Sequence, residues 1–273
     1  MLPQAGADAG SKTPTGPQTK LSIEDIVVEF ATEKQRVRVL DGFELTVGEG
    51  EFVSILGPSG CGKSTLLKVV AGLMEQNQGR IRIEGQIIKG YDSRVGMIFQ
   101  EYALFPWLTL RENVEFGLRV KGLPRKERAE RSQRFIELVR LQGFENHYPQ
   151  QLSGGMKQRA ALARALVMDP EILLMDEPLA ALDAQTRITL QDEILAIAQK
   201  TRKTILYVTH SVDESVFLSD RVVVSTARPG RVKEIIEIDL PKPRDRTNSE
   251  FLLYEARTLK SVREEVIKMG EGR

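Results

Sequence analysis

The sequence predicts an α/β fold in which helices cover both faces of a parallel sheet and a smaller antiparallel sheet lies beside it. Unbroken apolar runs at 172–175 and 204–209 are separated by a helical segment, and such strands are typical of a parallel sheet buried on both faces. Nearer the N-terminus, arginine alternates with valine over 36–39 and with isoleucine over 80–83. This period of two predicts half-buried antiparallel strands.

The composition fits a globular chain and excludes several classes of protein. The chain has 273 residues, of which 41% are hydrophobic and 28% are charged, enough for a sizeable core. Lys and Arg number 39 against 38 Asp and Glu, so no basic excess is present to neutralise nucleic-acid phosphates. The single cysteine excludes an internal disulfide and fits a reducing compartment. No apolar run reaches membrane-spanning length and no secretory signal pattern begins the chain, so we expect no crossing of a membrane.

The elements follow in order from local signals. Residues 1–20 are rich in Pro, Gly, Ala and Thr and are predicted to form a disordered tail. Thr109 with Glu112 three residues later has the capping-box pattern that begins a helix. Pro124 predicts the start of a second helix, with a solvated face of mixed charge, that stops near Gly143. The other predicted elements are strands at 51–56 and 95–99, a helix after Ser153, a hairpin at 221–226 and 233–240, and a last helix at about 250–269.

A glycine-rich segment follows the predicted strand at 51–56. Residues 57–65 read GPSGCGKST and fit the pattern G-x-x-x-x-G-K-[ST], whose glycines let backbone N–H groups surround a phosphate at the start of a helix. Lys63 is predicted to reach the β- and γ-phosphates of a nucleotide, and the Ser64 hydroxyl to bind Mg²⁺. Cys61, beside Lys63, is expected to be a reactive thiol. The predicted phosphate-binding residues are Gly57, Pro58, Ser59, Gly60, Cys61, Gly62, Lys63, Ser64 and Thr65.

Two acidic residues end the apolar run at 172–175. A buried parallel strand delivers Asp176 to the carboxyl edge of the sheet, where open α/β sheets bind ligands. We therefore predict that Asp176 holds Mg²⁺, as the Walker-B carboxylate does. Glu177 is the candidate catalytic residue that orients or deprotonates an attacking water. These residues favour nucleotide hydrolysis without choosing between ATP and GTP.

Residues 152–159 read LSGGMKQR, which strongly resembles the LSGGQ signature of the ATP-binding cassette (ABC) proteins. Further motifs of that family stand in the family's order. They are an adenine-stacking aromatic at Phe30, the Q-loop glutamine Gln100, the D-loop ending at Asp183 and the switch histidine His210. The resemblance extends from residue 21 to about 240 and implies that the nucleotide is ATP.

The resemblance implies a P-loop NTPase (RecA-like) core with an antiparallel β subdomain and an inserted α-helical signature subdomain. It implies an ATPase domain at 21–245, with the helical subdomain at about 101–165. The last predicted helix indicates a C-terminal helical extension at 246–273. His210 is implied to be catalytic, and Gln100 to contact both ATP and Mg²⁺. Ser153, Gly154, Gly155 and Asp183 are implied to bind ATP held by a second copy of the chain, because the signature and the phosphate loop of one chain cannot face each other. A head-to-tail dimer with two composite sites is therefore expected.

A narrower resemblance concerns residues 99–109, which read FQEYALFPWLT. This segment is similar to the Q-loop of the nitrate, sulfonate and taurine importer group, although residues 179–180 are Leu-Ala where that group more often has Phe-Gly. The resemblance implies an ATP hydrolase coupled to transport, a translocase, lying peripherally on the cytoplasmic face of the inner membrane. It implies that transmembrane permease subunits contact 102–110, and that a periplasmic or lipoprotein solute-binding protein delivers the solute.

Two other classes of function are weighed against the importer subunit. A non-transport ABC-type ATPase acting on nucleic acid or the ribosome usually fuses two cassettes or carries a long coiled coil, and neither pattern is seen in this sequence. A scaffold that does not use nucleotide would be expected to lack Lys63 or Glu177, and both are present. We therefore expect an importer ATPase with no nucleic-acid partner.

Overall fold

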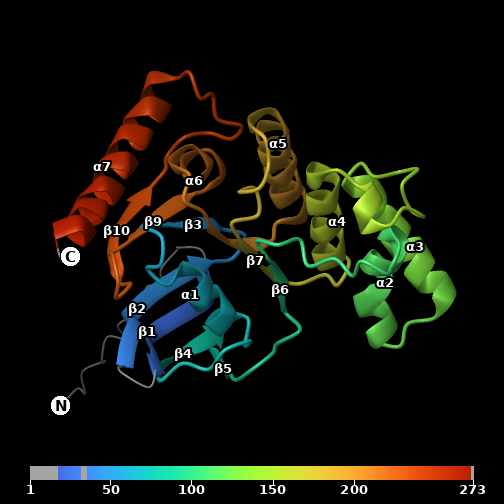
Figure 1. The fold of residues 1–273 in the computed structure, drawn as a ribbon, viewed down its shortest axis with the longest axis horizontal. Helices are drawn as coiled ribbons and strands as arrows, with labels where there is room; N and C mark the ends of the chain where they lie inside the picture. Colours follow the sequence, from blue (N-terminus) through green and yellow to red (C-terminus); the bar gives the residue numbers. More distant parts are fainter. Residues whose placement is uncertain (1–17, 32–35, 272–273) are drawn as a thin grey trace, which may run out of the picture.

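Two sheets organise the chain in the structure, a computed structural model that describes residues 18–31 and 36–271 (Figure 1). The larger sheet has the strand order β10-β9-β3-β8-β7-β6, and its strands are parallel except for β10. Its strands are β3 (Phe52–Leu56), β6 (Val95–Ile98), β7 (Ile172–Asp176), β8 (Thr204–Val208), β9 (Arg221–Ser225) and β10 (Val232–Glu237). The predicted parallel sheet and the predicted C-terminal hairpin are both confirmed.

The smaller sheet is antiparallel, as the alternating pattern predicts, with the order β2-β1-β4-β5. Its strands are β1 (Thr19–Ala31), β2 (Arg36–Gly48), β4 (Gln78–Ile83) and β5 (Gln86–Ile88). Residues 1–17 of the predicted tail lie outside the described residues. The tail is predicted to end at residue 20, and this bound is wrong because β1 begins at Thr19. Thr19 pairs with Gly48, and the buried Lys20 ammonium donates to Glu84 at 2.7 Å, which fixes the chain earlier than its composition indicates.

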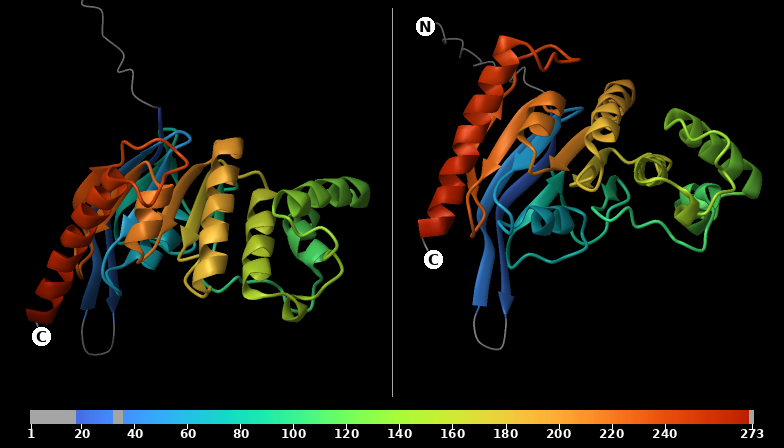
Figure 2. Two further views of the ribbon diagram at one scale, coloured as in Figure 1. Left: turned by 90° about the horizontal axis from the view of Figure 1, so that it is seen from above. Right: turned by 45° about the horizontal axis from the view of Figure 1, so that its top comes forward.

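Helices cover both faces of the larger sheet, and three helices with a short 3-10 turn form a group that contacts the sheet through its last helix (Figure 1). The helices on the sheet are α1 (Lys63–Val70), α5 (Ala184–Thr201), α6 (Val212–Leu218) and α7 (Ser249–Glu271). The group comprises α2 (Leu110–Val120), α3 (Arg125–Leu138), η1 (Pro149–Gln151) and α4 (Gly154–Leu166). Figure 2 shows α2 and α3 standing away from both sheets, with α4 between them and α5. Among the described helices, none combines the length and apolar character needed to cross a membrane.

Each face of the larger sheet has its own hydrophobic core. Side chains alternate between the two faces along each strand. Val53 and Leu206 pack with α1 and the smaller sheet, whereas Leu173 and Tyr207 pack with α4, α5 and α6. The helices α1 and α4 therefore lie on opposite faces of the sheet.

The predicted start of α2 is confirmed and the predicted end of α3 is not. Thr109 and Glu112 form both hydrogen bonds of the capping box. α3 ends at Leu138 rather than near Gly143, because Arg140 takes the left-handed conformation (φ 56°) and the Leu141 N–H donates to the Ile136 carbonyl at 3.0 Å. This bond closes the helix in the manner of a Schellman cap without a glycine.

Arg244 is a buried cation that stabilises the end of α6. Its guanidinium donates to the carbonyls of Val216 at 2.6 Å and Ile238 at 3.0 Å, and also to the Ser219 carbonyl. We expect Arg244→Met to lower the free energy of unfolding by at least about 3 kcal/mol, because several buried carbonyls would lose their donor. Urea unfolding measures the change. Arg257→Met is the control: this exposed residue pairs with Glu234 on the surface, and its loss is expected to matter by about 1 kcal/mol or less.

Candidate functional site

The phosphate loop, residues 57–62, joins the end of β3 to the start of α1 (Figure 1). Gly62 begins the helix in a left-handed conformation (φ 104°), and no side chain caps the first N–H groups of α1. Lys63 is buried, and its ammonium donates to the carbonyls of Gly57 at 2.8 Å and Pro58 at 3.0 Å. The loop thus curls round the Lys63 ammonium, with helix N–H groups free to bind an anion.

The loop packs tightly against β2, which decides the surroundings of its cysteine. A Cβ at Gly62 would lie 2.7 Å from Leu40 Cδ2 and 2.9 Å from Val39 Cγ1, so only glycine fits at this position. Cys61 is 1% exposed. The expectation of a reactive thiol is therefore not supported, because a reagent has no access to the Cys61 sulfur in the folded chain.

Ser64 and Asp176 meet although they are far apart in the sequence. The Ser64 hydroxyl donates to Asp176 Oδ1 at 2.8 Å. Burial raises the pKa of Asp176 above its ordinary value, which means that the anionic carboxylate lacks full solvation. The described residues contain no group of three or more His, Cys, Asp or Glu side chains placed to hold a metal. Two hard oxygen donors fit Mg²⁺, which completes its coordination with phosphate and water.

Glu177 adopts an uncommon backbone conformation directly after β7. Its φ is 43°, and its N–H donates to the Val208 carbonyl of the neighbouring strand at 2.9 Å. Its carboxylate lies 3.1 Å from His210 Nδ1. The His210 side chain is 60% exposed and that of Glu177 is 20% exposed, so the pair borders solvent. The two residues predicted to be catalytic are brought together, and a left-handed glutamate is the kind of strain that functional sites retain.

The strand order explains why these groups gather at one edge. β3, β8, β7 and β6 are neighbours in the sheet and run in the same direction. Their carboxyl ends therefore deliver, in that spatial order, the phosphate loop, His210, the pair Asp176 and Glu177, and Gln100. Gln100 is exposed two residues beyond β6, where Ile98 pairs with Met175.

The signature residues lie at the start of α4, beside the segment that follows β7. Ser153 is the N-cap of α4 and accepts from the Met156 N–H at 3.3 Å, and Asp183 caps α5 by accepting from the Thr186 N–H at 3.0 Å. The two helix starts are adjacent, since a Cβ at Gly155 would lie 2.7 Å from Thr186 Cγ2. Because α4 and α1 pack in different cores, the signature helix and the helix of the phosphate loop lie on opposite faces of the sheet in one chain.

Phe30 lies on β1 and is 41% exposed. It pairs with Val37 on β2, two residues from the Val39 side chain that approaches Gly62. The β1–β2 ribbon thus carries an exposed aromatic ring beyond the phosphate loop. An exposed ring in this position is suited to stacking on a planar base.

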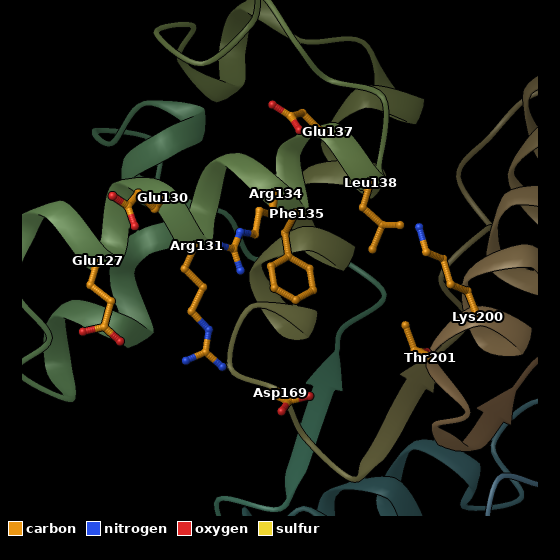
Figure 3. A pocket seen from close by; sticks show the side chains of 10 residues that line it. All are labelled: Glu127, Glu130, Arg131, Arg134, Phe135, Glu137, Leu138, Asp169, Lys200 and Thr201. Atoms are coloured by element: carbon orange, nitrogen blue, oxygen red, sulfur yellow. The ribbon is translucent and has the colours of Figure 1, made fainter.

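A cleft of about 760 Å³ opens elsewhere, between α3 and the end of α5 (Figure 3). Acidic and basic side chains both line it, so its charge does not select an anion. None of the predicted site residues is among them. The lining residues are Glu127, Glu130, Arg131, Arg134, Phe135, Glu137, Leu138, Asp169, Lys200 and Thr201.

The segment after Gln100, residues 101–109, forms a partly exposed loop that we call the aromatic loop, with Tyr102 and Leu104 packed against the core. Trp107 is 70% exposed, and its ring lies 5.7 Å from that of Phe105. Asn113, which is fully buried in α2, accepts from the Phe105 N–H at 2.8 Å and donates to the carbonyls of Phe105 and Leu108. Sequence reasoning missed Asn113, because an asparagine inside a helix carries no local signal of the loop that it holds.

Comparisons with known proteins agree with the motifs. The ABC transporter family model matches residues 40–180. An uncharacterized ABC transporter ATP-binding protein of Methanocaldococcus jannaschii is 54% identical over 251 residues, which are 92% of this chain and 94% of that protein. An aliphatic sulfonates import ATP-binding protein of Bacillus licheniformis is 47% identical over 88% of this chain and 93% of its own length.

Solved structures show the same fold. A dimeric structure of a bacterial ABC transporter cassette matches with a TM-score of 0.72 and 31% identity, over 81% of this chain and 100% of that chain. The same cassette in a post-hydrolysis state, bound to ADP and phosphate, matches equally well. The family match spans half of the chain and the relatives span most of it. We conclude that the chain belongs to the ABC transporter ATP-binding proteins, the ATP-hydrolysing translocases.

Proposed function

We propose that the chain is the ATP-hydrolysing subunit of an importer for aliphatic sulfonates or a similar small solute such as nitrate or taurine. The observation that carries the proposal is the edge of the larger sheet, where Lys63, Asp176 and Glu177 come together beside a loop with an exposed Trp107. The solute class is supported by relatives that are 44–47% identical and are named as aliphatic sulfonates import ATP-binding proteins.

Within this proposal each residue at the edge has one task. Lys63 leaves the carbonyls of Gly57 and Pro58 to bind the β- and γ-phosphates of ATP. Ser64 and Asp176, with Gln100 from the neighbouring strand, hold Mg²⁺, which when bound neutralises charge that develops on the phosphates. Glu177 accepts a proton from the attacking water.

His210 and the adenine complete the proposed site. The His210 Nδ1 lies beside the Glu177 carboxylate, so an N–H at that atom donates to Glu177 and holds the carboxylate in place near the γ-phosphate. Phe30 stacks on the adenine, as its exposure on β1 allows. The backbone of residues 57–65 surrounds the phosphates.

A second copy of the chain is proposed to complete each site. Ser153, Gly154 and Gly155 begin α4 on the face of the sheet opposite to α1, so they reach an ATP γ-phosphate only across a head-to-tail dimer, next to Asp183. The similarity to a cassette solved as a dimer supports this arrangement. ATP binding would close such a dimer, and hydrolysis would reopen it.

Permease subunits in the membrane are the proposed partners of the 102–110 region. Trp107 is its exposed anchor and Phe105 lies half-buried beside it, whereas Tyr102 and Leu104 pack against the core of the chain. Aromatic anchors of this kind contribute much of the energy of many interfaces. The chain would thereby lie peripherally on the cytoplasmic face of the cell membrane, with solute delivered by a periplasmic or lipoprotein binding protein and without a nucleic-acid partner.

Trp107→Ala tests the permease contact. We expect the variant to fold and hydrolyse ATP as the wild type does, because the indole is mostly exposed, yet to lose co-purification with membrane subunits. Affinity purification from detergent-solubilised membranes, with proteins identified by mass spectrometry and RNA assayed in parallel, measures the loss.

Tyr91→Ala is the matched control, since Tyr91 is also an aromatic residue that is 69% exposed but lies outside the aromatic loop. It should retain the membrane partner. Recovery of RNA instead of a membrane protein by the wild type would refute the importer proposal. Equal recovery of the permease by both variants would refute the assigned contact.

A further inference from the structure

Arg164 joins α4 to the aromatic loop. Its guanidinium donates to the Tyr102 carbonyl at 3.1 Å and to the Ala103 carbonyl, and it lies over the Phe105 ring at 5.8 Å from the ring centre. Arg164 thus contacts three residues of the loop that begins directly after Gln100. It stands on the helix that Ser153 begins.

The charge of Arg164 has no acidic partner in the part of the chain that the structure describes. Among the described residues, no carboxylate lies within ion-pair distance of it. Burial lowers the pKa of Arg164 from its ordinary value, although a guanidinium stays protonated in proteins. Two backbone carbonyls and an aromatic ring therefore replace the water that this half-buried cation has lost. Their positions around the guanidinium are constrained as a result.

One of these carbonyls belongs to a residue in an unusual conformation. Ala103 has a φ of 49°, in the left-handed region that alanine rarely adopts. A residue with a Cβ remains there only when its surroundings hold it. A second contact lies nearby, since a Cβ at Gly154 would be 3.3 Å from the Tyr102 hydroxyl oxygen. The last turn of α4 thus contacts the aromatic loop, and the start of α4 lies close to it.

We propose that Arg164 is a positioning residue that holds Ala103 in its left-handed conformation and thereby fixes the aromatic loop between Gln100 and Trp107. Its guanidinium contacts Tyr102, Ala103 and Phe105, which lie along the chain between Gln100 and the exposed Trp107. The functional consequence rests on the proposed function, because Gln100 and Trp107 have their roles only there.

Arg164→Met and Ala103→Gly provide the test. Methionine keeps most of the side-chain length and removes both donors. Glycine adopts a positive φ without a Cβ penalty, so Ala103→Gly removes the need for the Arg164 contact. We expect Arg164→Met to lower kcat for ATP at least about tenfold while KM changes less than about twofold, because the phosphate loop is untouched. The double variant should recover at least about a third of the wild-type kcat.

Trp107 supplies a readout that needs no ATP, because it is the only tryptophan in the chain. In Arg164→Met, the fluorescence anisotropy of Trp107 should fall and acrylamide should quench it more strongly. Ala103→Gly in the same background should restore both values toward those of the wild type. If the wild type fails to hydrolyse ATP, the proposed function fails while the fluorescence comparison still decides the role of Arg164.

Arg202→Gly is the control for a general effect of glycine, since Arg202 is also left-handed (φ 50°) but ends α5 away from the aromatic loop. It should not rescue Arg164→Met. If Arg164→Met does not fold, Arg164→Lys is used, which keeps the charge but cannot donate to both carbonyls in the planar geometry of arginine. Unchanged Trp107 fluorescence in the variant, or equal rescue by the glycines at 103 and 202, would overturn the proposal.

Discussion

Glu177→Gln is expected to slow ATP hydrolysis by about 10²–10⁴-fold while ATP binding is retained. The amide has nearly the shape of the carboxylate but cannot accept a proton from water. Because the Lys63, Ser64 and Asp176 contacts are unchanged, ATP should accumulate in the closed state. Single-turnover hydrolysis and gel filtration with Mg-ATP measure the two effects: slow phosphate release, and a shift of the chain to the size of a dimer.

Glu250→Gln provides the control for Glu177→Gln, since Glu250 is exposed at the start of α7. It should behave as the wild type. Hydrolysis at the wild-type rate in Glu177→Gln would remove this carboxylate from the mechanism. If Glu177→Gln hydrolyses ATP slowly but stays monomeric with ATP, the result supports Glu177 as the base and contradicts the proposed dimer.

Lys63→Ala is expected to weaken ATP binding itself, by about 10–100-fold. A charge-assisted hydrogen bond to phosphate contributes about 1.5–3 kcal/mol, and each 1.4 kcal/mol is about a tenfold change in affinity. Lys63 also donates to the carbonyls of Gly57 and Pro58, so the variant is expected to relax the loop. Isothermal titration calorimetry with a slowly hydrolysed ATP analogue gives the dissociation constants.

Lys68→Ala is the matched control for Lys63→Ala. Lys68 lies on the same helix α1 and is exposed in its last turn. Its removal should change ATP affinity less than about twofold, as for a typical exposed charge. Glu177→Gln and Lys63→Ala should therefore differ in kind, one losing turnover and the other losing affinity. Similar affinities in Lys63→Ala and wild type would contradict the role given to the ammonium.

Much of the fold was predictable because its signals are local. The Thr109 capping box, the helix start after Ser153 and the buried strands of the larger sheet each depend on residues within a few positions of one another. The family resemblance adds the ATP site to this local information. The parallel direction of these strands then follows, because buried strands that alternate with helices along the chain are joined by crossover connections.

The errors also have physical causes. The end of α3 was predicted near Gly143 because glycine is the usual helix stop, but Arg140 takes the left-handed position instead. Cys61 was predicted to react because its sequence neighbours favour a thiolate. Its burial against the rest of the fold could not be seen from those neighbours.

What the sequence determined by itself is the set of motifs, their order, and the helices and strands that carry them. Only the tertiary structure decided which side chains meet: Glu177 with His210, Ser64 with Asp176, and Arg164 with the carbonyl of Ala103. It also decided that α1 and α4 lie on opposite faces of the sheet. Local signals act through backbone conformation and hydrophobic periodicity over a few residues. These contacts join residues 33 to 112 positions apart, and they arise only when the strands and helices pack into one edge and two cores.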